Sequence, residues 1–194
     1  MDSLAAVKAT VQALEAIGVD YMLVGALSVN AYAVSRSTKD ADFVSRPQSG
    51  QVGAIMRHLG ADFHLDPQLQ LETLTNSMRN VVTHLPTDFQ IELFRLNVND
   101  EHHQERFRRR RRQYLKAIDC EAWIPLAEDV VIQKVRWQRR KDLDDVVNVL
   151  SISASVLDWK YLQQWTKKHG TFATLQGLIK EVPNLPMPVE FSST

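Results

Sequence analysis

The residues in this sequence best suited to chemistry are Asp40 and Asp42, two carboxylates separated by one residue. Their alternation with Ala41 and Phe43 indicates a short strand, with both aspartates on one face and the apolar side chains directed into a core. Two neighbouring carboxylates repel each other unless a cation lies between them. Hard divalent ions such as Mg²⁺ take oxygen ligands and keep positions for phosphate oxygens. The pattern therefore predicts either a site for two-metal phosphoryl chemistry or a solvated edge strand.

The segment before the aspartates contains elements that could position them. Residues 21–24 form an apolar strand pattern that ends at Gly25, and residues 27–34 leave room for a short helix. The turn at Gly25 and the amides at the start of a helix attract anions, so this segment is a candidate for binding a triphosphate. Ser28 adds a hydroxyl group nearby.

This arrangement resembles the nucleotidyltransferase superfamily with the DNA polymerase β-like fold, whose motif runs hydrophobic-Gly-Gly/Ser, a helix, then hydrophobic-Asp-x-Asp/Glu-hydrophobic. Gly-Ala-Leu-Ser followed by Arg-x-Thr-Lys-Asp-Ala-Asp is most similar to the bacterial minimal and AbiEii-type nucleotidyltransferases. The resemblance implies nucleotide binding at Gly25, Ala26 and Ser28. It also implies a two-ion Mg²⁺ site that includes Asp40 and Asp42. The sequence departs from the motif at Ala26, whose side chain cannot hydrogen-bond a phosphate.

A third carboxylate generally completes two-metal nucleotidyl transfer, because it binds one metal ion and helps to deprotonate the attacking hydroxyl. Residues 88–93 alternate between polar and apolar types, and the triplet centred on Glu92 has the hydrophobic-acid-hydrophobic pattern of the family. We therefore predict Glu92 as a catalytic residue and metal ligand together with Asp40 and Asp42. Asp88 is the alternative on the same strand face. Most comparable family members carry Asp in place of Glu92.

The second half of the chain carries a basic motif that also resembles the family. Its members often have an acidic-hydrophobic-Lys helix followed by Arg-x-Lys-Asp-x-x-Asp, and Lys134 and residues 140–145 resemble these two parts here. Lys134, on a helix facing the sheet, is a candidate to contact the β- or γ-phosphate of the nucleotide as a point charge, and Arg140 or Lys141 is a candidate to do the same from the start of the next helix. Asp142 and Asp145 lie one helical turn apart, and they either hold these basic residues in place or act structurally, Asp142 as a helix cap.

The most concentrated positive charge is the run of five arginines at residues 108–112, with Phe107 and Tyr114 close by. Such a run can contact an RNA backbone through its phosphates and by stacking. It can equally be a solvated helix face or an edge strand protected by charge. The chain has 23 basic and 23 acidic residues, and this zero net charge favours the structural interpretation. His102 and His103 lack partners at metal-ligand spacing and are predicted to lie at the surface.

The composition limits the class of protein. A chain of 194 residues with 44% hydrophobic content is long enough for one sizeable core and a helical extension. The single cysteine, Cys120, excludes an intramolecular disulfide and is consistent with a reducing cytosol, so we predict a cytoplasmic location. No apolar run approaches the length of a membrane span, and the N-terminus has a helix pattern in place of a signal peptide.

The order of elements predicts an α+β fold, with a mixed nucleotidyltransferase-type sheet and flanking helices followed by a C-terminal helical bundle. The predicted strands cover residues 21–24, 40–43, 61–65, 78–85, 88–96, 114–118 and 121–124. The predicted helices cover residues 4–17, 27–34, 48–59, 126–137, 142–152, 158–169 and 172–182. The predicted domains are a nucleotidyltransferase core at 1–124, a helical subdomain packed on it at 125–182 and a flexible tail at 183–194.

The resemblance implies a Mg²⁺-dependent enzyme that transfers NMP from an NTP to a hydroxyl acceptor and has a toxin–antitoxin role. The predicted acceptor is RNA, with tRNA 3′ ends as candidates, or a partner protein. The alternative is a catalytically inactive binding or antitoxin module that keeps the fold, because Ala26 and Glu92 depart from the family pattern.

Overall fold

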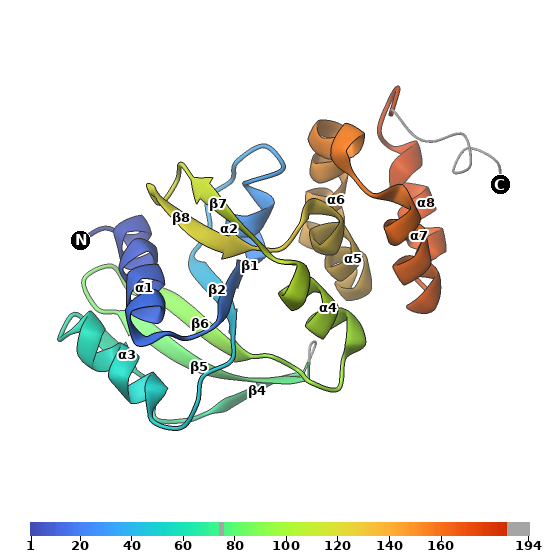
Figure 1. The fold of residues 1–194 in the computed structure, drawn as a ribbon. Coiled ribbons are helices and arrows are strands. Elements are labelled where there is room, and N and C mark those ends of the chain that lie inside the picture. The colour runs from blue at the N-terminus through green and yellow to red at the C-terminus, as the bar shows by residue number, and fades with distance from the viewer. Residues whose placement is uncertain (74–75, 186–194) are drawn as a thin grey trace. The chain divides into compact units, whose positions relative to one another are not determined.

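The computed structural model describes residues 1–73 and 76–185, which divide into two compact units (Figure 1). The first unit consists of Met1–Leu27 and Ser37–Pro125. The second consists of Ser28–Arg36 together with Leu126–Thr194, of which residues 126–185 are described. The helical second unit therefore includes a short segment from the N-terminal part of the chain.

The first unit contains a six-stranded mixed sheet. Its strands are β1 (Tyr21–Val24), β2 (Asp40–Ser45), β3 (Phe63–Leu65), β4 (Gln70–Glu72), β5 (Ser77–His84) and β6 (Phe89–Arg95). The strand order is β1-β2-β6-β5-β3, with β4 also paired to β5. The β2–β6 pair is parallel, and the other pairs are antiparallel. A separate antiparallel pair follows, formed by β7 (Arg111–Leu115) and β8 (Cys120–Ile124).

The helices of this part of the chain are α1 (Ser3–Ile17), α2 (Gly25–Val29), α3 (Gln51–Leu59) and α4 (Glu101–Arg109). The predicted N-terminal helix is confirmed. Asp2 caps α1 by accepting a 2.8 Å hydrogen bond from the Ala5 amide, and Gly18 ends it with a left-handed φ of 70°. α1 and α3 lie side by side (Figure 1).

The second unit is helical. It contains α5 (Ala127–Trp137), α6 (Arg140–Ser153), a 3₁₀ turn (Ala154–Val156), α7 (Trp159–Lys168) and α8 (Phe172–Lys180). α5 packs against α6 and α7, and α8 packs against α6 and α7. A mixed sheet with flanking helices followed by helices confirms the predicted α+β fold class.

Several local predictions differ from the structure. Residues 66–76 had no assigned element, and within them β4 pairs with β5. No helix was predicted at residues 101–109, where α4 forms. His102 and His103 were predicted at the surface and are buried in α4, so that prediction is wrong. Of the predicted tail, residues 186–194 lie outside the described part of the chain. No helix within that described part is both long and apolar enough to span a membrane.

Candidate active site

The three predicted carboxylates share one face of the sheet. The parallel register of β2 and β6 pairs Asp42 with Glu92, and Asp40 with Gln90. Adjacent strands are about 4.8 Å apart and paired residues project to the same side. Asp88, the alternative third carboxylate, instead lies in the turn before β6 with a φ of 54°.

The same face becomes apolar further along the strands. Val44, two residues after Asp42, is buried in a cluster with Met22 and with Phe107 of α4. Phe94, two residues after Glu92, packs against that cluster. Along β2 and β6, the polar part of this face therefore lies at the beginning of β2 and in the facing part of β6.

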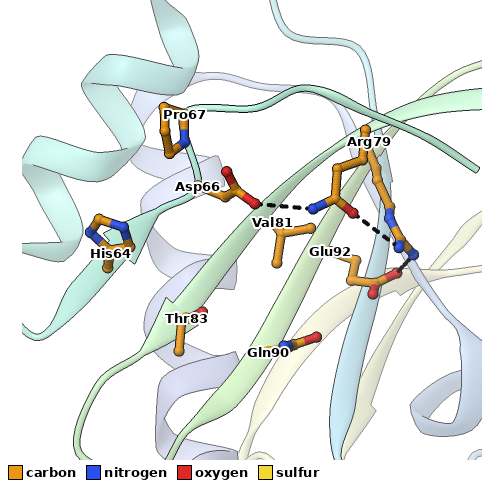
Figure 2. Close-up of a pocket in the computed structure, with 9 residues that line it drawn as sticks. His64, Asp66, Pro67, Arg79, Val81, Thr83, Gln90 and Glu92 are labelled. Atoms are coloured by element: carbon orange, nitrogen blue, oxygen red, sulfur yellow. Dashed lines mark hydrogen bonds and ion pairs between the residues drawn. The ribbon is translucent and has the colours of Figure 1, made fainter.

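Glu92 has a cationic partner that the sequence analysis did not identify. Arg79 of β5 donates a hydrogen bond of 2.5 Å to Glu92 Oε2 and another of 3.2 Å to Gln70 Oε1 (Figure 2). Burial nevertheless raises the pKa of the Glu92 carboxyl above its ordinary value, because it outweighs the opposing effect of Arg79, and the charge of Asp40 adds to the rise. Glu92 therefore holds its negative charge less firmly than an exposed glutamate does.

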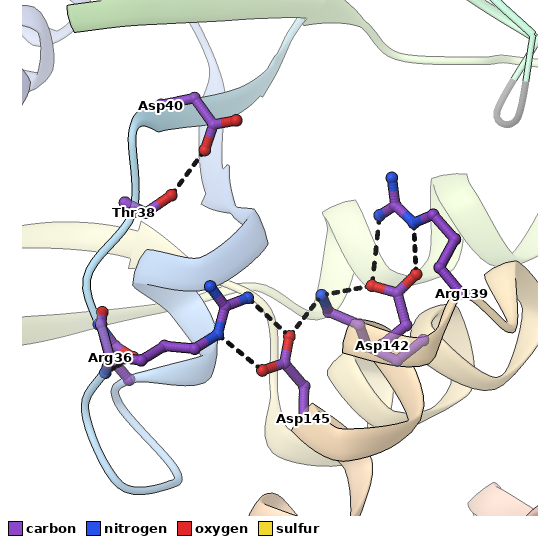
Figure 3. Close-up of polar contacts among 8 residues, drawn as sticks. Arg36, Thr38, Asp40, Arg139, Asp142 and Asp145 are labelled. Atoms are coloured by element: carbon purple, nitrogen blue, oxygen red, sulfur yellow. Dashed lines mark hydrogen bonds and ion pairs between the residues drawn. The ribbon is translucent and has the colours of Figure 1, made fainter.

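The turn after β1 lies directly against Asp42. Gly25 adopts a left-handed φ of 64°, and a Cβ built on it would overlap with Asp42 Oδ2. Asp40, in turn, is held by Thr38, whose hydroxyl donates a 2.6 Å hydrogen bond to Asp40 Oδ1 (Figure 3). The backbone turn and the two aspartates thus form one compact arrangement at the end of β1 and the start of β2.

The fit of these carboxylates to Mg²⁺ is partial. Within residues 1–73 and 76–185, no group of three or more His, Cys, Asp or Glu side chains is arranged to hold a metal ion. Proteins usually bind Mg²⁺ with one or two carboxylates while substrate phosphates supply further oxygens. Asp40 and Asp42 fit that mode, whereas Glu92 is directed to Arg79. The residues suit an ion that is shared with a nucleotide rather than one enclosed by protein alone.

Replacing Gly25 by Ala is expected to destabilise the first unit more than replacing Gly18 by Ala. Both glycines have a left-handed φ, which costs a side-chain-bearing residue about 1–2 kcal/mol. A Cβ at Gly18 meets no atom within 4 Å, whereas one at Gly25 meets the Asp42 carboxylate. The clash adds roughly 1–3 kcal/mol. Urea unfolding of the two variants measures the difference, and equal losses would contradict the close approach to Asp42.

A second cluster of charged residues lies within the helical unit. Lys134 Nζ donates hydrogen bonds of 2.8 Å to Asp142 Oδ1 and of 2.8 Å to Asp145 Oδ2 (Figure 3). Arg36 donates two hydrogen bonds to Asp145, at 2.8 and 2.9 Å. Arg139 donates two to Asp142, at 2.6 and 3.2 Å. Lys134 is thus held between two aspartates that each also bind an arginine.

The pKa values of both aspartates reflect this pairing. Burial by itself would raise the pKa of the Asp142 carboxyl, but hydrogen bonds from Arg139 and Lys134 lower it below its ordinary value. The pKa of Asp145 is lowered in the same way, against burial, by Arg36 and Lys134. Of the two alternatives for Asp142, the helix cap is wrong, because the N-cap of α6 is Arg139 and Asp142 is buried in the first turn.

The predicted nucleotide-binding residues are divided between the two units. Gly25 and Ala26 belong to the first, whereas Ser28, Lys134 and Arg140 belong to the second. Ser28 and Lys134 are buried, and Arg140 is exposed at the start of α6. Their contact with a nucleotide stays a prediction.

The arginine run at residues 108–112 is divided between the end of α4 and the start of β7. Within the first unit, three of its members pair with acidic side chains. These pairs are Arg108 with Glu105 at 2.7 Å, Arg110 with Asp20 at 2.9 Å, and Arg112 with Glu121 at 2.9 Å. The pairing supports a structural role for much of this charge, and RNA binding by the run stays a prediction.

A family model described as "Nucleotidyltransferase of unknown function (DUF6036)" matches residues 2–177. No curated protein sequence matches the chain.

The solved structures that resemble this fold include the following three. JHP933 from Helicobacter pylori has a TM-score of 0.54 and 14% identity, over 90% of this chain and 74% of its own. The antibiotic-resistance factor ANT(2'')-Ia has a TM-score of 0.57 and 10% identity, and the match covers 90% of this chain and 95% of ANT(2'')-Ia. An antigenic nucleotidyltransferase-like protein from Paracoccidioides brasiliensis has a TM-score of 0.56 and 15% identity, and the match covers 93% of this chain and 94% of that protein. At these identities the likeness establishes the fold alone.

Proposed function

We propose that this chain, which belongs to the DUF6036 family of nucleotidyltransferases of unknown function, transfers a nucleoside monophosphate from an NTP to a hydroxyl group. Membership in the family confirms the resemblance found in the sequence and implies a nucleotide substrate. The observation that carries the proposal is the arrangement of Asp40, Asp42 and Glu92 on one polar face, with the Gly25 turn against Asp42. The predicted toxin–antitoxin role and cytoplasmic location stay predictions.

The proposed reaction assigns separate tasks to the three carboxylates. Asp40 and Asp42 would hold Mg²⁺, which supplies neutralisation of phosphate charge and lowers the pKa of a hydroxyl group. Thr38 keeps the Asp40 carboxylate in place. The acceptor oxygen forms a bond to the α-phosphorus, the bond from that phosphorus to the bridging oxygen breaks, and pyrophosphate leaves.

The proton of the acceptor hydroxyl goes to Glu92 in this proposal. A general base works best when its pKa lies near the working pH, and burial raises the pKa of Glu92 in that direction. Arg79 binds Oε2 of Glu92, which fixes the orientation of the carboxylate. Arg79 is therefore a positioning residue in this scheme.

A second candidate function is a catalytically inactive binding module. The Arg79–Glu92 ion pair at 2.5 Å favours it, because a guanidinium can neutralise this face without any metal ion. The departures at Ala26 and Glu92 point the same way. The presence of both aspartates beside a glycine turn that leaves room for Asp42 favours the enzyme.

Mg²⁺ together with a non-hydrolysable NTP analogue is expected to stabilise the protein, because a ligand that binds only the folded state shifts the unfolding equilibrium. The gain is about 2.7 kcal/mol at a ligand concentration one hundred times Kd. Thermal unfolding with analogues of all four nucleotides, with and without Mg²⁺, measures the rise in Tm. An unchanged Tm with every nucleotide at millimolar concentration would select the inactive module.

A further inference from the structure

The polar face continues from the candidate carboxylates into a pocket of about 380 Å³ in the first unit (Figure 2). The register places Asp40 of β2, Gln90 of β6, Thr83 of β5 and His64 of β3 in one row across the sheet. The last three of these residues line the pocket. Since adjacent strands lie about 4.8 Å apart, the pocket begins one strand away from Asp40.

A chain of hydrogen bonds forms one wall of this pocket. Asp66 Oδ2 accepts a 3.0 Å hydrogen bond from Gln70, whose Oε1 accepts one of 3.2 Å from Arg79, which in turn binds Glu92 at 2.5 Å (Figure 2). The wall therefore ends at Glu92, the residue to which the proposed function assigns the acceptor proton. A molecule in the pocket lies beside that carboxylate.

The charge of the pocket disfavours anions. Its lining includes the carboxylates of Asp66 and Glu92 and a single guanidinium, that of Arg79, which is bound to Glu92. Asp40 and Glu72 both interact electrostatically with Glu92, so further negative charge lies close by. A phosphate or carboxylate group entering this space would be repelled.

The size and polarity of the pocket indicate the kind of molecule that fits. Pockets for small molecules commonly measure about 300–1,000 Å³, and most of them are lined by apolar side chains. Here Thr83, Gln90 and His64 present a hydroxyl, an amide and an imidazole beside the apolar Pro67 and Val81. These groups match a ligand with several hydroxyl groups at close spacing.

We propose that this pocket binds the acceptor, a small polyhydroxylated molecule that is neutral or positively charged. The inference rests on the proposed function, because only that function requires an acceptor hydroxyl beside Glu92. It places that hydroxyl beside Glu92, which lies on β6 two residues after Gln90 and also lines the pocket. Acceptors on RNA or protein, which the sequence resemblance implies, become alternative outcomes of the test.

The test uses the full chain and three probes of similar size that differ in charge: glucosamine, glucose and glucuronate. Ligand-observed saturation-transfer NMR measures the affinity for each probe. We expect glucosamine to bind at least as well as glucose, and glucuronate to bind at least tenfold more weakly than glucosamine.

Variants identify the pocket as the place of binding. Thr83→Val and Gln90→Leu each remove one hydrogen-bonding group, so each is expected to weaken glucosamine binding about five- to tenfold. Gln164→Leu, at an exposed position on α7, is the matched control and is expected to bind glucosamine like the wild type. Absence of probe binding, or binding that Thr83→Val and Gln90→Leu leave unchanged, would overturn the inference, as would equal affinity for glucuronate.

A parallel titration with Mg²⁺ and an NTP separates this inference from the function on which it rests. Nucleotide binding without probe binding rejects the pocket as the acceptor site and is consistent with the proposed nucleotidyltransferase function. Probe binding without nucleotide binding rejects the proposed function and leaves a polyol-binding pocket. Transfer of labelled NMP to RNA or protein that is unaffected by Thr83→Val and Gln90→Leu rejects the assignment of the acceptor.

Discussion

Replacing Asp42 by Asn is expected to reduce nucleotidyl transfer at least a hundredfold, which corresponds to about 2.7 kcal/mol of transition-state stabilisation. Asn has nearly the same shape as Asp, so the packing against Gly25 is kept while the negative charge is lost. Under the proposed function, Asp40 alone would then face the ion and the triphosphate, because Glu92 is bound to Arg79. The rate of labelled NMP transfer, together with calorimetric titration of Mg²⁺ and NTP, measures the effect.

Asp88→Asn is the matched control for this prediction. Asp88 is the other carboxylate that the sequence offered near Glu92, and it lies in the β5–β6 turn with a φ of 54°. Asn adopts a positive φ readily, so the turn is preserved. We expect transfer by Asp88→Asn to stay within about twofold of the wild type, since surface substitutions cost little. A large loss of transfer activity in Asp88→Asn, with no loss in Asp42→Asn, would show that the active site lies at the β5–β6 turn.

Sequence periodicity was sufficient to predict the carboxylate face. Asp40 and Asp42 alternate with the buried Ala41 and Phe43, and a strand has a period of two residues. The same alternation around Glu92 predicted β6 and the face of the strand on which Glu92 lies. Local rules of this kind depend only on neighbours in the chain, and here they identified the strands that carry the candidate site.

Partners that come from other strands could not be predicted in this way. Arg79 meets Glu92 because the β5–β6 register pairs Val81 with Glu92 and so places Arg79 diagonally across from it. Both strands were predicted, and a register count from the short turn between them would have brought these side chains together. The contact between Arg79 and Glu92 follows from the register of β5 and β6, and composition and motifs do not give the register.

Tertiary packing also determined which side chains of residues 101–109 are buried. They are rich in charged and polar types, and their arginines suggested a solvated surface. In the structure α4 buries His102, His103 and Arg106, while Phe107 joins the apolar cluster beside Val44. Burial of this kind depends on distant strands, so local propensity was overridden.

The extent of the helical unit depends on contacts over long sequence distances. Arg36 binds Asp145, which lies 109 residues away, and Ser153 Oγ donates a 2.7 Å hydrogen bond to the carbonyl of Tyr32. These contacts tie residues 28–36 to the C-terminal helices. The sequence showed Arg36 within a motif and Asp145 within another, but no spacing rule connects the two.

Replacing Lys134 by Met is expected to lower the free energy of unfolding of the helical unit by about 3–5 kcal/mol. Met fills a similar volume but leaves the buried Asp142 and Asp145 without the ammonium group that bridges them. Lys141→Met, at an exposed position of α6, is the control and is expected to change stability by less than about 0.5 kcal/mol. Urea unfolding followed by circular dichroism at 222 nm measures both variants at pH 7.

The pH dependence of this loss tests whether the ion pairs are its cause. The pKa values of Asp142 and Asp145 are lowered from 3.8 in the folded state, so the stability that they contribute is present above pH 3.8. It disappears as the pH falls through their folded pKa values, because the protonated carboxyls no longer attract Lys134. The difference between wild type and Lys134→Met should therefore be greatest near pH 7 and shrink below pH 3.8. A difference that stays constant through acid titration would show that Lys134 stabilises the unit by packing, and its charge would then remain available for a phosphate.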